Sequence, residues 1–99
     1  MNAYITELRD IIRHLHGVEA KHVESVPVVE QHKGQTVWDG VVEVFDLIGH
    51  PKTHRVYAWA HETDEPGKPR HVTVLHLPPV VSPETAVRAS IVQEYRNNA

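Results

Sequence analysis

Residues 54–61, His-Arg-Val-Tyr-Ala-Trp-Ala-His, alternate from the arginine onward between large and small side chains. Because successive side chains of a strand point to opposite faces, the pattern predicts a β-strand with two unlike sides. The small side, one valine and two alanines, suits close packing of a helix. The large side, with Tyr57, Trp59 and His61, could be a partner interface, a ligand platform or a second part of the core.

Two segments have the periodicity and end signals of amphipathic helices. Apolar residues recur at helical spacing over residues 3–16, and Gly17 directly afterwards suits a left-handed helix C-cap. A second helix is predicted over residues 83–96, because Ser82 is a good N-cap and Pro83 fits the first helical position. The two helices therefore lie near the two ends of the chain.

Between these helices the sequence predicts a run of strands. The expected strands cover residues 23–30, 36–48, 54–62 and 70–77. Because proline lacks a backbone N–H, Pro27 makes the first strand an edge strand or a broken one, and whether it joins the sheet stays open. Short connections favour antiparallel neighbours. We therefore expect a single α+β domain over residues 1–99, a two-layer α-β(3-4)-α fold with an antiparallel meander sheet and both helices on one face.

This arrangement would cover the small side of residues 54–61 and leave the large side open. The binding candidates on the open face are Tyr57, Trp59, His61, His71 and Thr73. Exposed apolar and aromatic surface mostly marks protein interfaces, and a homodimer is the simplest assembly for a small domain. The leading hypothesis is a small cytoplasmic binding or assembly module that self-associates through this face or through an edge strand.

The composition excludes several classes of function. The 99-residue chain has a formal net charge of −3, which gives no general attraction to nucleic acid or to an anionic membrane. It has no cysteine, so disulfides, thiolate metal sites and cysteine nucleophiles are excluded. No apolar run approaches the roughly 20 residues that span a bilayer, and the N-terminus does not resemble a signal peptide. A cytoplasmic location without a membrane partner is expected.

The nine histidines make metal binding the first chemistry to consider. His61 and His71 flank a predicted hairpin loop and could share one sheet face, with Glu62 or Asp64 as a nearby carboxylate. A zinc site needs three or four converging ligands, and the sequence brings only these two histidines together. It contains neither a serine nucleophile elbow nor a glycine-rich phosphate loop. We expect no enzyme, no catalytic residue and no cofactor, and a histidine-based metal or small-molecule site stays as one alternative.

A second alternative, nucleic-acid binding, comes from a family resemblance. Residues 49–57, Gly-His-Pro-Lys-Thr-His-Arg-Val-Tyr, resemble the Gly-Pro-x-His loop before an aromatic-bearing strand in double-stranded RNA-binding domains. The order of helix, antiparallel strands and helix also resembles that family. The residues that this resemblance would place on RNA are His50, Lys52, His54 and Arg55. Where the family has a lysine cluster, at the start of the second helix, this chain has Glu84 and Arg88, so the fold carries over more readily than the activity. Single strands could instead stack on the aromatic face.

Overall fold

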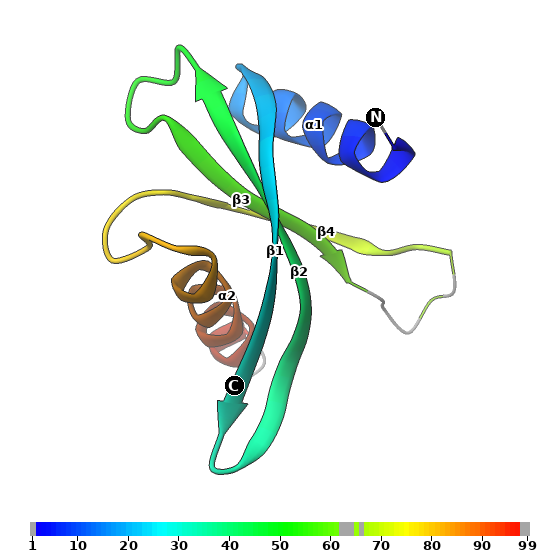
Figure 1. The fold of residues 1–99 in the computed structure, drawn as a ribbon, viewed down its shortest axis with the longest axis vertical. Coiled ribbons are helices and arrows are strands. Elements are labelled where there is room, and N and C mark those ends of the chain that lie inside the picture. Colours follow the sequence, from blue (N-terminus) through cyan, green and yellow to red (C-terminus); the bar gives the residue numbers. More distant parts are fainter. Residues whose placement is uncertain (1, 62–64, 66, 98–99) are drawn as a thin grey trace.

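The computed structural model describes residues 2–61, 65 and 67–97 (Figure 1). Its elements, in chain order, are α1 (Ala3–His16), β1 (Glu19–His32), β2 (Gln35–Ile48), β3 (Arg55–His61), β4 (Arg70–Leu75) and α2 (Pro83–Asn97). All four strands form one antiparallel sheet in the order β1-β2-β3-β4. The α+β class and the meander sheet are therefore confirmed. No helix within the described ranges is long and apolar enough to cross a bilayer.

The segment around Pro27 belongs to the sheet. β1 begins at Glu19, before the expected start, and Pro27 lies opposite Val41 of β2. β1 is an edge strand, the place in a sheet where proline is tolerated. The turn to β2 is formed by Lys33 and Gly34, whose φ angles of 52° and 76° match the right-handed twist of a hairpin. The result is a long twisted β1–β2 hairpin.

α1 covers the small side of β3. Its buried residues Ile5, Leu8 and Ile12 form one core cluster with side chains that include Val56 and Ala58. Large side chains on the helix thus meet small side chains on the strand. The N-terminus of α1 is capped by Asn2, whose side chain accepts the N–H of Ile5 at 2.8 Å, and the helix ends at Gly17 as expected.

α2 covers the large side of β3. Ala86 and Val87 are fully buried in a second cluster, which contains Tyr57 and Trp59. Here the size relation is reversed, because small helix residues lie over large strand residues. The N-terminus of α2 is capped by Ser82, whose hydroxyl accepts the N–H of Thr85 at 3.2 Å.

The two helices therefore lie on opposite sides of β3 and β4, as Figure 1 shows. This placement corrects the expectation that both helices share one face and leave the other open. The physical reason is the aromatic content of the large side, which needs a cover as much as the small side does. The uncovered face predicted for Tyr57 and Trp59 does not exist in this structure.

Candidate functional site

Tyr57 and Trp59 lie in the core and not on a binding surface. Their exposed fractions are 2% and 1%. The ring of Trp59 meets Trp38 edge to face at 5.6 Å between centroids, and the Tyr57 hydroxyl is hydrogen-bonded to His76 Nδ1 at 2.7 Å. Burial raises the pKa of Tyr57 above its ordinary value. These contacts account for the aromatic pattern as packing.

His61 and His71 do not share a face. They belong to successive cross-strand pairs of β3 and β4, and their side chains therefore point to opposite sides of the sheet. His61 Nε2 lies 3.6 Å from the Glu94 carboxylate of α2, and His71 Nε2 lies 3.5 Å from the Glu7 carboxylate of α1. Each histidine thus faces a carboxylate of a different helix, and the expected two-histidine site is not formed.

Metal binding gains no support from the rest of the described chain. Within residues 2–61, 65 and 67–97, no three histidine, aspartate or glutamate side chains are grouped so that they could hold a metal ion. Glu62 and Asp64, the carboxylates expected near His61, lie outside the described residues.

Thr73 points to the α1 side of the sheet and contacts His16. The His16 Nε2 and Thr73 Oγ1 atoms are 3.1 Å apart, and the ring of His50 lies 6.3 Å from the ring of His16 between centroids. Burial, and secondarily the charge of His50, lower the pKa of His16 below its ordinary value of 6.5. His16 therefore resists protonation in the folded chain.

The lowered pKa of His16 predicts acid sensitivity. As the pH falls through about 6.5, the unfolded chain binds a proton at this histidine that the folded chain resists, so the free energy of unfolding decreases. This stability is fully present above the ordinary pKa and is lost below it. We expect His16→Gln, which can still contact Thr73, to lose less stability than the wild type between about pH 8 and about pH 5.5 in urea titrations. His32→Gln, on the exposed hairpin, is the control, and an unchanged pH dependence in His16→Gln would contradict the assignment.

Three of the residues expected on RNA, His50, Lys52 and His54, lie in the connection from β2 to β3, and Arg55 is the first residue of β3. Some of their hydrogen-bonding groups are used within the chain. His50 Nδ1 accepts the backbone N–H groups of Lys52 at 3.1 Å and Thr53 at 3.3 Å. Arg55 donates through Nε to Asp46 at 3.1 Å. Lys52 and His54 are exposed, and the His54 ring lies near that of His76. Arg55 is thus engaged by a carboxylate, which leaves Lys52 as the exposed cation of this set.

A buried carboxylate, Glu43, did not emerge as a candidate from the sequence. It lies on β2 with an exposed fraction of 4%, and its Oε1 is 2.9 Å from His22 Nε2. The same oxygen accepts the hydroxyl of Ser25. Its neighbours Val42, Val44 and Phe45 are all buried, and this apolar run was the one signal in the sequence. Because both contacts come from β1, Glu43 fixes the two strands of the hairpin to each other.

The outer edge of β4 is the most distinctive feature of the sheet. The His76 N–H donates to the Arg55 carbonyl at 3.0 Å, which continues the register in which Val56 faces Leu75. Hydrogen-bonded and non-hydrogen-bonded pairs alternate along an antiparallel ladder. In β4, the backbone groups of even-numbered residues therefore point to β3, and those of odd-numbered residues point outward.

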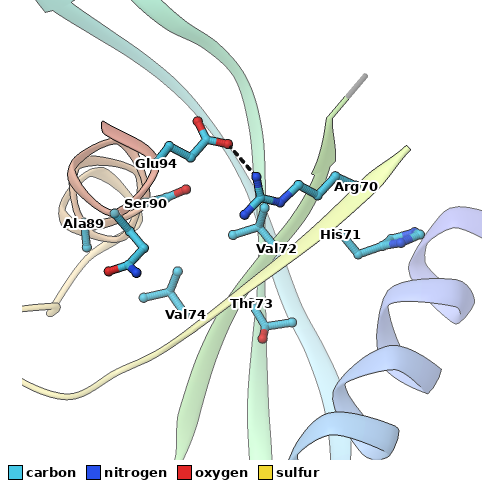
Figure 2. Close-up of a pocket in the computed structure, with 9 residues that line it drawn as sticks. Arg70, His71, Val72, Thr73, Val74, Ala89, Ser90 and Glu94 are labelled. Atoms are coloured by element: carbon cyan, nitrogen blue, oxygen red, sulfur yellow. Dashed lines mark hydrogen bonds and ion pairs between the residues drawn. The ribbon is translucent and has the colours of Figure 1, made fainter. Parts of the chain in front are cut away.

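The outward groups of β4 belong to His71, Thr73 and Leu75. The Leu75 carbonyl accepts the N–H of Leu77 at 2.9 Å, and β4 has no strand neighbour on this side within the described sheet. Figure 2 shows β4 between the two helices, with Val72 and Val74 toward α2 and His71 toward α1. A cavity of about 420 Å³ lies between β4 and α2 and is bordered by the ion pair of Arg70 with Glu94.

The opposite edge of the sheet, β1, is protected in several ways. It contains Pro27 at its centre, it carries the charged residues Lys21 and Glu24, and its register against β2 shifts at two points. Proline, charge and bulges all hinder the addition of another strand. β4 has neither a proline nor a bulge, and its residues Val72–Leu75 are uncharged. The two edges therefore differ, and only β4 is suited to accept a strand.

Comparison with known proteins finds no matching family model, no similar curated protein and no similar solved structure. The function is therefore inferred from the geometry of the chain itself.

Proposed function

We propose that this chain is a small assembly module that forms a homodimer by antiparallel pairing of β4 with β4 of a second copy. The observation that carries the proposal is the unpaired, unprotected outer edge of β4. Unpaired N–H and C=O groups on an edge strand form a template for another strand. A second copy of the chain supplies the same edge, and a two-fold axis satisfies both copies at once.

The register of this pairing follows from the outward groups. With the two-fold axis at Val72, His71 of each copy faces Thr73 of the other. Each such pair exchanges two backbone hydrogen bonds, and none of them needs the occupied carbonyl of Leu75. The two sheets then become one continuous sheet. The hydrogen bonds between the two β4 strands would replace hydrogen bonds to water, so their net contribution is modest. The affinity of the dimer therefore depends also on side-chain contacts across the new interface.

The test is the oligomeric state of a variant that loses one outward N–H. We expect the wild type to sediment as a dimer at high micromolar concentration and Thr73→Pro to sediment as a monomer with cooperative unfolding. Proline at this position removes no bond to β3, and edge strands accept it. Thr73→Val is the matched control, because it also loses the contact with His16 but keeps the N–H, and it should remain a dimer.

Two outcomes would overturn the proposal. One is a wild type that sediments as a monomer over the whole concentration range. The other is a Thr73→Pro variant that stays a dimer, because the contact would then lie elsewhere on the molecule.

A further inference from the structure

The β1–β2 hairpin and α2 enclose a groove that the proposed dimer does not use. Its volume is about 640 Å³, within the range of small-molecule sites. The apolar side chains that line it are Val37, Ile91, Val92 and Tyr95. One wall is the distal part of the hairpin, and the other is the C-terminal half of α2, which lies beside the hairpin in Figure 1.

The apolar lining of this groove is unusually exposed. Val37, Val92 and Tyr95 have exposed fractions of 48%, 49% and 78%. Val37 has no partner on β1, because Glu30 pairs with Trp38 and the next pair joins Gln31 with Thr36. Val37 is thus the extra residue of a bulge, and bulges redirect side chains. Apolar groups grouped in this way on a small domain mark a site of interaction.

The charge around the groove is positive, although the whole chain has a net charge of −3. Arg88 and Arg96 and the imidazole of His32 line it. Glu30 is its one lining carboxylate in the described chain, and Arg88 binds that group through Nε and, at 3.5 Å, through Nη2. The positive charge of Arg96 therefore has no lining carboxylate left to balance it.

We propose that this groove binds a single-chain amphiphile with an anionic head, a fatty carboxylate. The hydrocarbon chain would cover Val37, Val92 and Tyr95, and the carboxylate would meet Arg96. An unbranched hydrocarbon brings no polar groups onto this apolar wall, whereas the backbone amides of a peptide would each need a partner there. The exposed apolar surface, and a cation that no second lining carboxylate of the described residues balances, together favour this ligand. The proposal is independent of the β4 dimer.

The test compares two probes that share a tail and differ in the charge of the head, dodecanoate and dodecylammonium, each below its micellar concentration. Binding is followed by backbone amide chemical shifts in ¹H–¹⁵N spectra. We expect saturable shifts at Val37, Val92 and Arg96 with dodecanoate, and binding of dodecylammonium at least about threefold weaker, since the ion pair is exposed. Val92→Glu should weaken dodecanoate binding by about tenfold, through lost apolar contact and added repulsion.

Two controls keep the test specific. Val81→Glu changes a valine of similar exposure, 55%, that does not line the groove, and it should leave dodecanoate binding unchanged. Arg96→Glu should remove the preference for the anionic head, whereas Lys52→Glu, which changes the charge by the same amount outside the groove, should keep it. The proposal is overturned if the two probes bind equally, if the shifts lie outside the groove, or if Val81→Glu weakens binding as much as Val92→Glu.

Discussion

Replacement of Trp59 by alanine is expected to lower the free energy of unfolding by about 3–5 kcal/mol, because it leaves a cavity in the core cluster that α2 covers. The side chain is 1% exposed and lies among Val44, Tyr57 and Val87. A loss of this size is a large fraction of the stability of a small domain, which is about 5–15 kcal/mol. We therefore expect Trp59→Ala to be folded only marginally.

The measurement is urea unfolding followed by far-ultraviolet circular dichroism, at one fixed protein concentration. Trp38→Ala is the matched control, because Trp38 contacts Trp59 edge to face but is only partly buried. It should lose clearly less stability than Trp59→Ala. Acrylamide should quench the fluorescence of Trp59, measured in Trp38→Phe, only weakly, because the remaining indole is enclosed.

The two interpretations of the large side of β3 predict opposite results for this variant. If Trp59 were a partner-binding residue on an open face, Trp59→Ala would keep the stability of the wild type and lose only association. A stable Trp59→Ala variant would therefore contradict the core position of this residue. A Trp59→Ala variant that is less stable but still dimerises fully at a low temperature, where it is folded, would show that the interface does not include Trp59. Pairing through β4 requires this result.

The sequence predicted the elements well because their signals are local. The helical spacing before Gly17, the cap at Ser82 and the alternation in residues 54–61 each depend on neighbouring residues only. The alternation even separated the two faces of β3 correctly, since α1 takes one side and α2 the other. Which helix lies on which side is not a local property, because it depends on how the chain crosses the sheet edge after β4.

The candidate site was harder to predict because it also depends on residues that are distant in the sequence. His61 and His71 can be placed together only if the register of β3 against β4 is known, and a shift of one residue moves a side chain to the other face. Glu43 resembles a solvent-facing strand residue until the side chains of His22 and Ser25 on β1 are known to contact its carboxylate. The outward groups of β4 likewise follow from register and not from composition.

The core cluster that α1 covers is expected to be as sensitive to truncation of a buried side chain as the cluster that α2 covers. Leu8 is fully buried, and it lies with Ile12, Phe45 and Val56 in the first cluster. We expect Leu8→Ala to lower the free energy of unfolding by about 2–5 kcal/mol, because it removes buried methyl groups and leaves a cavity. Urea unfolding under the conditions used for Trp59→Ala measures the effect.

The control comes from the same helix. Leu15 has an exposed fraction of 58%, so Leu15→Ala removes the same atoms from a largely hydrated position and should change the stability by less than about 1 kcal/mol. Similar losses in both leucine variants would mean that α1 does not cover the sheet with the face that contains Leu8. A large loss in Leu8→Ala together with a large loss in Trp59→Ala is the combination that two helices on opposite faces of β3 require. With both helices on one face, the large side of β3 would be hydrated, and only the first of these losses would be found.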